Sequence, residues 1–394
     1  MTRRTVAEYR RHVAQLLSAL DSLPAETVEL DAALGRLLAV DVTAPMDLPQ
    51  FRNSQMDGYA VDAASIAAVP VELPVLQTVA AGDAGPAAFA SGTAVKVMTG
   101  APVPPGADCV VPVEDTTTSG DRVTVTRSRS VGEFVREPGT DVRTGERLLS
   151  AGVLLAPRHV AVLAAVGVRT VEVRRRPRAA VITTGAELVA AGTALQPGQI
   201  YDSNGIALAT SLRANGVDVT SVSRSSDDVA EFRELLTAAI EDADVVFTSG
   251  GVSMGDFEVV KDALTPLGGE FGHVAMQPGG PQGSTVVDGV PVLSFPGNPV
   301  STLVSFEVFA RPLLRRAAGL PDLAGYEVRL AASLTSVPDR QQFLRGRKVD
   351  DTVELVSGPG SHLVAGMALA DVLIDIPAEV TVLEAGAHVQ VQEL

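Results

Sequence analysis

The sequence predicts a multidomain protein of the α/β plus β class, and two observations support this prediction. Residues 178–320 alternate short apolar strands with helix patterns, which is typical of a doubly wound, parallel sheet. Residues 71–125 and the chain beyond Pro321 carry short β-type runs broken by glycine and proline, which indicate a mostly β domain and a small β-barrel or sandwich. Because 394 residues are too many for one ordinary core, we expect about two to four domains.

The composition is that of an acidic globular protein. Lys and Arg number 31 against 47 Asp and Glu, and the resulting net charge of −16 argues against binding to DNA, RNA or anionic lipid. Cys109 is the single cysteine, which excludes intrachain disulfides and thiolate metal clusters. The basic N-terminal stretch lacks an unbroken apolar core, and Arg158 with His159 interrupts the longest apolar candidate span. We therefore expect a soluble cytoplasmic protein without membrane insertion.

The order of elements is clearest in residues 178–320. Apolar runs predict strands at 179–183, 217–222, 245–247 and 290–295, with further strand residues around Phe271. Helices are expected from Asn204 to Gly216, after the possible capping pair Asp228 and Glu231, near 259–264 and from Val300. Outside this region, apolar spacing predicts helices at the N-terminus from Val6, at 33–39 and at 157–166.

Polar and glycine residues of this region gather just after strands or at the starts of helices. They are Glu187, Asp202, Asn204, Asp228, Glu258, Pro278, Gly279, the turn 248–255 and the segment 296–299. In a doubly wound sheet these positions share the edge where ligands bind. The glycines of the turn allow backbone N–H groups to approach a phosphate, whereas an ordinary glycine-rich turn is the alternative. Each carboxylate alone fits a helix cap or a solvated face; together they indicate an anionic ligand bound through Mg²⁺.

Two further candidates lie in loops ahead of residue 178. Asp57 stands directly before Gly58 in a polar loop, for which an Asp-Gly turn is the alternative explanation. Thr99 lies in a loop, residues 98–108, that its prolines and glycines hold rigid. A purely structural role of these turn residues explains the loop nearly as well as function does.

Eight motifs occur in the order expected of one family. They are NSQMDGYA, MTGAPVPPGAD, REPGTDVRTGERLLSAG, TTGAEL, YDSN, SGGVSMGD, PGNPVS and FLRGRKV. The chain resembles, over nearly its whole length, the molybdopterin molybdotransferases of the MoeA type, which also include the E domain of gephyrin. The resemblance implies insertion of molybdate into adenylylated molybdopterin with release of AMP, assisted by Mg²⁺.

The resemblance also implies an elongated, four-domain subunit that forms a homodimer with an active site shared between subunits. The implied domains are a helical and β linker domain (1–45 with 148–177), a β-rich domain (46–147), a MogA-like α/β domain (178–320) and a C-terminal β-barrel (321–394). A molybdopterin adenylyltransferase or molybdoenzymes are implied as further partners.

Family positions supply the site residues. The implied catalytic residues are Asp57, Thr99, Glu187, Asp228 and Glu258, of which Glu187, Asp228 and Glu258 are also the implied metal ligands. The implied substrate-binding residues are Asp202, Ser203, Asn204, Ser249, Gly250, Gly251, Ser253, Gly255, Pro278, Gly279, Pro281, Pro296, Gly297, Asn298, Pro299 and Arg345.

Several positions depart from the family pattern. Gln277 and Gly280 stand where lysines are common in the family, and His273 stands where another lysine is frequent. Ala365 and Gly366 replace the usual paired serines. Asp371 replaces a frequent asparagine, and Ala186 and Glu258 each replace an aspartate. Arg345 or Arg347 could compensate for the lost charge.

These departures favour an alternative, a gephyrin-like dimeric scaffold that binds protein partners with weak or lost transferase activity. An adenylyltransferase is disfavoured because its family prefers a threonine-glycine continuation after SGG. The sequence leaves open whether the pocket prefers molybdate or tungstate.

Overall fold

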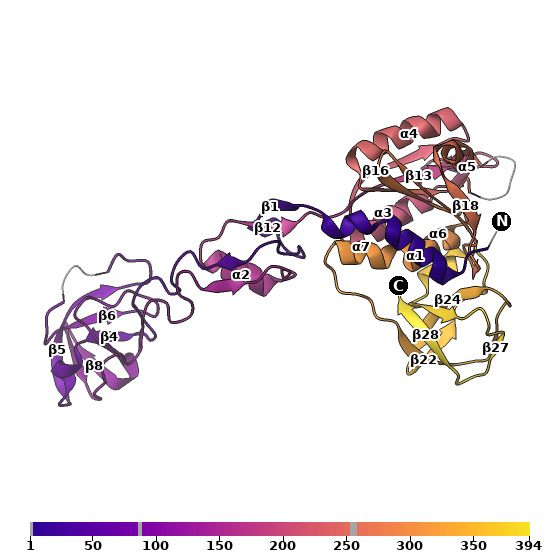
Figure 1. The fold of residues 1–394 in the computed structure, drawn as a ribbon. Coiled ribbons are helices and arrows are strands. Elements are labelled where there is room, and N and C mark those ends of the chain that lie inside the picture. The colour runs from indigo at the N-terminus through magenta and orange to yellow at the C-terminus, as the bar shows by residue number, and fades with distance from the viewer. Residues whose placement is uncertain (1–2, 86–88, 253–257) are drawn as a thin grey trace. The chain divides into compact units, whose positions relative to one another are not determined.

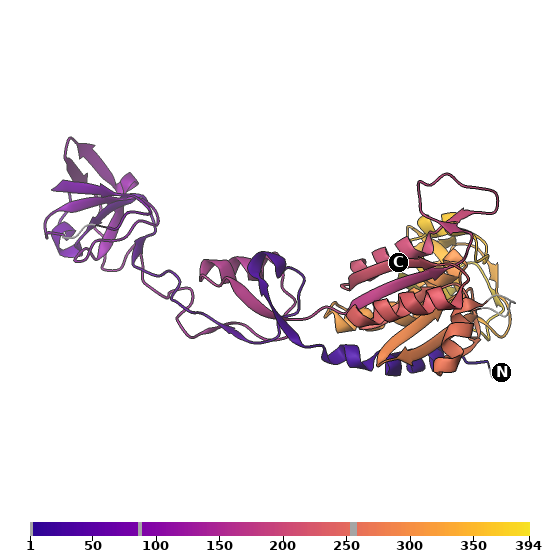
Figure 2. The same cartoon turned by 90° about the horizontal axis from the view of Figure 1, so that it is seen from above.

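The computed structural model describes residues 3–85, 89–252 and 258–394 (Figures 1 and 2). The chain forms two compact units. The first comprises Met1–Glu26, Gly35–Leu37 and Val173–Leu394, and the second comprises Thr27–Leu34 and Leu38–Glu172. The finer division into four domains stays a prediction. No helix within the described ranges combines the length and apolar content needed to cross a membrane.

A six-stranded sheet forms the centre of the first unit. Its order is β16-β13-β17-β21-β20-β18. The strands are β13 (Arg178–Thr184), β16 (Asp218–Ser225), β17 (Val245–Ser249), β18 (Glu270–His273), β20 (Pro281–Val287) and β21 (Val290–Phe295). Strands β16, β13, β17 and β21 are parallel, as the sequence predicts, whereas β20 and β18 continue the sheet as antiparallel strands. β20 was not expected because its polar residues Gln282, Ser284 and Thr285 break the apolar pattern, although all three are buried.

Helices cover both faces of this sheet (Figure 1). α4 and α5 pack on one face against Ala180 and Ile182 of β13, and α1, α3, α6 and α7 pack on the other face against Ala179 and Val181. Burial on both faces explains why the central strands are nearly continuous apolar runs. The helices are α1 (Val6–Leu16), α3 (Asn204–Ala214), α4 (Val229–Asp242), α5 (Val259–Leu264), α6 (Pro299–Ser305) and α7 (Arg311–Ala317).

Local signals set the start of α1. The Thr5 hydroxyl accepts from the Glu8 N–H, and the Glu8 carboxylate accepts from the Thr5 N–H, which completes a capping box. Val6, Tyr9 and Val13 then point into the core beneath the sheet, as their helical spacing predicts.

The C-terminal part of the first unit is a closed five-stranded β-barrel. Strands β24, β25, β22, β28 and β26 pair in that order, and β26 pairs back with β24, so the barrel leaves no open edge. The elements are β19 (Met276–Gln277), β22 (Tyr326–Leu330), β23 (Leu334–Thr335), β24 (Gln341–Val349), β25 (Thr352–Leu355), α8 (Val364–Ala368), β26 (Val372–Ile376), β27 (Val382–Leu383) and β28 (His388–Glu393). Short β19 extends the barrel sheet by pairing with β24, which joins the barrel to the α/β part.

The second unit contains a six-stranded sheet of order β7-β4-β6-β5-β9-β8. The strands of this unit are β2 (Val42–Thr43), β3 (Asn53–Ser54), β4 (Gly58–Val61), β5 (Val71–Val79), β6 (Ala94–Val97), β7 (Cys109–Pro112), β8 (Thr116–Ser119), β9 (Arg122–Val125), β10 (Val135–Arg136) and β11 (Arg147–Leu149). The predicted helix at 157–166 is α2 (Pro157–Ala165). β1 (Ala25–Glu29) and β12 (Thr170–Arg174) pair where the chain passes between the two units.

The prediction of a helix at residues 33–39 is wrong. Its apolar spacing is helical, but Gly35 takes a φ of +70°, a left-handed turn that ends any helix there. The preceding residues Leu30–Ala32 form a single 3₁₀ turn instead.

Candidate functional site

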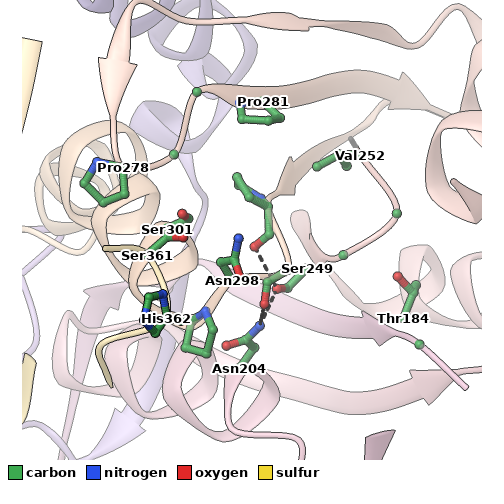
Figure 3. Close-up of a pocket in the computed structure, with 18 of the residues that line it drawn as sticks. Thr184, Asn204, Ser249, Val252, Pro278, Pro281, Asn298, Ser301, Ser361 and His362 are labelled. Carbon is green, nitrogen blue, oxygen red and sulfur yellow. Dashed lines mark hydrogen bonds between the residues drawn. The ribbon is translucent and has the colours of Figure 1, made fainter. Parts of the chain in front are cut away.

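A cavity of about 1140 Å³ lies at the carboxyl ends of the parallel strands (Figure 3). Every residue that lines it belongs to the first unit. The predicted site residues that it brings together are Glu187, Asp202, Ser203, Asn204, Ser249, Gly250, Gly251, Glu258, Pro278, Gly279, Pro281, Pro296, Gly297, Asn298 and Pro299. Ser253 and Gly255 lie outside the described residues. The ligand edge inferred from the order of strands and helices is therefore the edge where the structure places the cavity.

The glycine-rich turn after β17 is packed too closely for other residues. Gly250 has a φ of +102°, and a Cβ added there would lie 2.6 Å from the Thr184 hydroxyl oxygen. A Cβ on Gly297, in the turn after β21, would lie 3.3 Å from the Cα of Gly250. The Gly250 N–H donates to the Phe295 carbonyl oxygen at 3.1 Å. This amide therefore ties the two turns together.

Asn204 and Ser249 fix the floor of the cavity. The Asn204 side-chain amide donates to the Ser249 hydroxyl at 2.9 Å and to the Gly297 carbonyl at 2.7 Å. The Ser249 hydroxyl also lies 3.0 Å from the Thr302 hydroxyl of α6. Figure 3 shows the bond between Asn204, at the start of α3, and Ser249, at the end of β17. The network of bonds holds the ligand edge in one arrangement.

Asp202 organises the start of α3. Its side chain is only 8% exposed. One carboxylate oxygen accepts from the Gly205 N–H at 3.0 Å, and the other accepts from the Thr183 hydroxyl at 2.7 Å. Arg224 lies 3.9 Å from the second oxygen. Both oxygens thus have protein partners, and Asp202 supports the cavity wall more than it presents charge to a ligand.

The carboxylates predicted as metal ligands occupy different places. Glu187 and Glu258 line the cavity. Asp228 does not, because its side chain caps α4 and accepts from the N–H groups of Ala230 at 2.8 Å and Glu231 at 2.9 Å. Its neighbour Asp227 lines the cavity and accepts from the Ala186 N–H at 3.3 Å.

The carboxylates predicted as metal ligands therefore do not form a preassembled cluster. Within residues 3–85, 89–252 and 258–394, no group of three or more His, Cys, Asp or Glu side chains is placed to hold a metal ion. Mg²⁺ often uses only one or two carboxylates together with substrate phosphates. Glu187 and Glu258 suit that kind of site, which substrate would have to complete.

Asp57 and Thr99 belong to the second unit, where the fold brings them together across 42 positions of sequence. One Asp57 oxygen accepts from the Thr99 N–H at 2.7 Å and from the Thr99 hydroxyl at 2.8 Å. These two bonds, the backbone one foremost, hold the pKa of the Asp57 carboxyl below its ordinary value. The pair forms a charged, exposed corner beside β4 and β6.

Arg345 is fully buried and does not line the cavity. Its guanidinium donates to the Ser357 hydroxyl at 3.0 Å, to the Gly360 carbonyl at 3.2 Å and to the Gly358 carbonyl. Burial lowers the pKa of this guanidinium. Because Gly360 belongs to the stretch 359–362 that lines the cavity, Arg345 positions this wall from behind. Arg347, the other basic candidate, is exposed and lies 3.6 Å from Glu354.

The cavity also contains residues that sequence reasoning missed. They include Arg3, Thr184, Asp227, Arg340, Ser361 and His362. The Thr184 hydroxyl is buried without a hydrogen-bond partner in the described part of the chain. Asp227 could have been found as the neighbour of Asp228, and Ser361 and His362 from the polar stretch before α8. Arg3 and Arg340 had no local signal, because only backbone pairing with residues 273–276 brings them to the cavity.

Comparisons with known proteins agree along the whole chain. Residues 4–167 match the MoeA N-terminal region (domain I and II), residues 180–316 a probable molybdopterin binding domain, and residues 327–394 the MoeA C-terminal region (domain IV). Molybdopterin molybdenumtransferase 2 of Mycobacterium tuberculosis is 44% identical over 99% of this chain and 100% of its own. The molybdopterin molybdenumtransferase of a Nostoc species is 36% identical, covering 97% of this chain and 92% of its own.

A solved structure gives the same result. The molybdopterin biosynthesis MoeA protein of Pyrococcus horikoshii superposes with a TM-score of 0.79 at 33% identity, over 97% of this chain and 98% of that one. The family models, the full-length relatives and the shared fold together confirm the resemblance that the motifs indicated. The chain belongs to the MoeA family of molybdopterin molybdenumtransferases.

Proposed function

We propose that this protein is a transferase of molybdenum cofactor biosynthesis that inserts molybdate into adenylylated molybdopterin and releases AMP. The observation that carries the proposal is the cavity, where a glycine-rich turn, two glutamates and several basic side chains meet at the ligand edge of the matched molybdopterin binding domain. Such a combination suits a substrate that carries phosphates and an oxyanion. The scaffold alternative is not favoured, since the full-length curated relatives bear the transferase name.

The proposed roles follow from where each group lies. The turn after β17 receives the phosphate end of the substrate, held in place by the Asn204, Ser249 and Gly297 bonds. Glu187 and Glu258 are the residues that would hold Mg²⁺ together with the substrate, and the ion would withdraw charge from the leaving phosphate. Asp202 and Arg345 hold the walls of the cavity in position.

The homodimer stays part of this proposal. Asp57 and Thr99 lie in the second unit, whereas every lining residue of the cavity lies in the first. The family resemblance implies that these two residues act at the active site of the other subunit, and further protein partners and a cytoplasmic location also remain proposals.

The deciding experiment measures AMP release from adenylylated molybdopterin on addition of molybdate and Mg²⁺. Glu187→Gln keeps the size of the side chain but removes its charge, so we expect AMP release to fall by about a hundredfold or more. Glu234→Gln, an exposed position of α4 outside the cavity, removes the same charge and should release AMP at the wild-type rate. Wild-type turnover by the folded Glu187→Gln protein would rule out the assigned role of Glu187.

A further inference from the structure

Asp57 and Thr99 lie in two different loops of the second unit. Asp57 directly precedes β4, and Thr99 follows β6; these two strands are antiparallel neighbours in the six-stranded sheet (Figure 1). The hydrogen bonds of Thr99 to the Asp57 carboxylate, at 2.7 and 2.8 Å, require that both loops leave the sheet in fixed directions. A change in the direction of either loop would separate the carboxylate from its donors.

Thr99 occupies a tight turn formed by residues 98–101. The Ala101 N–H donates to the Met98 carbonyl at 2.9 Å and closes this turn. Gly100 takes a φ of +79°, the left-handed conformation that the third residue of a type II turn requires. The Thr99 N–H does not take part in closing the turn and donates to Asp57 instead.

The backbone of Ser54 fastens this turn to the loop that carries Asp57. The Ser54 N–H donates to the Ala101 carbonyl at 3.0 Å, and the Ser54 carbonyl accepts from the Gly100 N–H at 2.9 Å. On its other side Ser54 pairs with Val135 of β10. Ser54 is therefore held between two segments of the unit, and it is completely buried, with 0% of its surface exposed.

The side chain of Ser54 directs the chain towards Asp57. Its hydroxyl donates to the Met56 carbonyl at 2.6 Å and accepts from the Met56 N–H at 3.3 Å. A serine hydroxyl that binds the N–H two residues ahead forms a local turn. Because the Met56 carbonyl belongs to the peptide plane that joins Met56 to Asp57, the hydroxyl fixes the orientation of that plane. Ser54 thus sets the direction from which the Asp57 side chain starts.

The segment 111–113 holds Asp57 from the opposite side. The Asp57 carbonyl accepts from the Val113 N–H at 3.1 Å. A Cβ placed on Gly58 would lie 2.2 Å from the Val111 carbonyl oxygen, so only glycine permits this close approach of the two backbones. Asp57 is therefore held between this segment and the Ser54 hydroxyl.

We propose that Ser54 is the positioning residue of the Asp57–Thr99 pair, which it joins through its backbone and orients through its hydroxyl. This inference rests on the proposed function, in which Asp57 and Thr99 act at the active site. Ser54 is buried and acts through these two residues. A change of its side chain should therefore disturb the charged pair without removing either member.

The test compares Ser54→Ala with the wild type in the full-length protein. Ser54→Ala removes the hydroxyl and keeps the backbone bonds to Gly100 and Ala101, so the fold should remain intact. We expect the Thr99 amide proton to exchange with solvent faster by about tenfold or more, the factor for losing a hydrogen bond to a charged group. The pKa of Asp57 should rise towards its ordinary value, because the same bond lowers it.

Amide exchange is followed by NMR on protein labelled with ¹⁵N-threonine, and Thr99 is assigned from the signal that is missing in Thr99→Ser. The other threonine amides show in the same spectra whether the fold is retained. Ser65→Ala is the matched control, because the Ser65 hydroxyl donates to the Asp62 carboxylate at 2.7 Å in the same unit and does not contact the pair. Ser65→Ala should leave the exchange of Thr99 and the pKa of Asp57 at their wild-type values.

Faster exchange confined to Thr99 in Ser54→Ala would support the proposal. Unchanged exchange of Thr99, an equal acceleration in Ser65→Ala, or an acceleration shared by all threonines would overturn it. No substrate is present in this experiment, so the result stands even if the AMP release assay fails for the wild type.

If the wild type releases AMP, a second readout becomes accessible. Ser54→Ala should then lower kcat by about tenfold and leave KM nearly unchanged, because a misplaced catalytic group slows the reaction without weakening substrate binding. Ser65→Ala should release AMP at the wild-type rate. A wild-type kcat in Ser54→Ala would overturn the positioning role.

Discussion

Thr99 donates two hydrogen bonds to Asp57, and these bonds lower the pKa of the Asp57 carboxyl by unequal amounts. The backbone N–H is the larger influence and the hydroxyl the smaller one, and both lower the pKa of the Asp57 carboxyl. A backbone donor cannot be removed by changing the side chain. The aspartate should therefore keep much of its low pKa in any variant of residue 99 that preserves the loop.

Thr99→Val tests this difference at a single residue. We expect the pKa of Asp57 to rise but to remain below the ordinary value, since the N–H bond is retained. A carboxyl whose pKa is lowered by folding adds stability above its unfolded pKa and loses it as pH falls through the folded value, so the variant should be less stable than wild type at neutral pH and equal to it in strong acid. Carboxyl NMR titration gives the pKa, and Thr99→Ser, which keeps the hydroxyl, is the control. A pKa identical in all three proteins would contradict the assignment.

At the scale of an element, the start of helix α4 depends on Asp228, a residue for which the sequence suggested two roles. Asp228 was predicted both as a helix cap and as a metal ligand, and the structure has its carboxylate bound to two N–H groups at the start of the helix. Glu231 does not complete a capping box, because its carboxylate accepts from the Ser226 N–H at 3.0 Å. The helix start thus depends chiefly on Asp228.

Substitution at Asp228 separates capping from charge. Asp228→Ala should lower the free energy of unfolding by about 1 kcal/mol, whereas Asp228→Asn keeps a capping oxygen and should stay close to wild type. Urea unfolding gives the stability of each variant. If Asp228 acts as a cap alone, Asp228→Asn should also release AMP at nearly the wild-type rate; a large loss of AMP release at unchanged stability would instead favour the metal role that the sequence suggested.

Elements with a regular apolar pattern could be predicted from the sequence, and those held by distant pairing could not. β13, β17 and β21 are nearly continuous apolar runs, and α1 carries its own capping box, so local residues sufficed. β20 is buried with polar side chains, one of which, Gln282, bonds to Ser305 of α6, a contact that no local pattern encodes. In the site, the order of strands and helices located the ligand edge, but the approach of Arg3 and Arg340 depends on backbone pairing with residues 273–276, which lie far away in the sequence.

At the scale of the whole molecule, the cavity and the buried cysteine lie in different compact units. The first contains the cavity and most of the helices, and the second contains Cys109, buried in β7. Burial, with a smaller effect of Asp108, raises the pKa of the Cys109 thiol to about 12. The thiol is thus almost wholly protonated and inaccessible while the second unit is folded.

Thiol labelling should therefore report the unfolding of the second unit alone. We expect no reaction of the native protein with a chromogenic disulfide reagent at pH 8 over several minutes, and complete reaction of one thiol per chain in denaturant. Far-UV circular dichroism, to which the helices of the first unit contribute most, should be recorded along the same urea series. Two separate midpoints would indicate independent units, and rapid labelling of the native protein would contradict the buried environment of Cys109.

The pairing of Arg4 with residues 273–275 determines how the protein should be prepared for these measurements. A purification tag or fusion partner joined ahead of Arg3 would leave the fold beside a residue that lines the cavity, where it could hinder ligand binding and place its own charges beside Arg3. Leu394 instead ends the chain at the barrel, where its N–H donates to the Asp371 carbonyl at 3.0 Å and its side chain reaches solvent. A tag appended there avoids the cavity-lining residues, so rates of AMP release should be compared on proteins extended at the C-terminus.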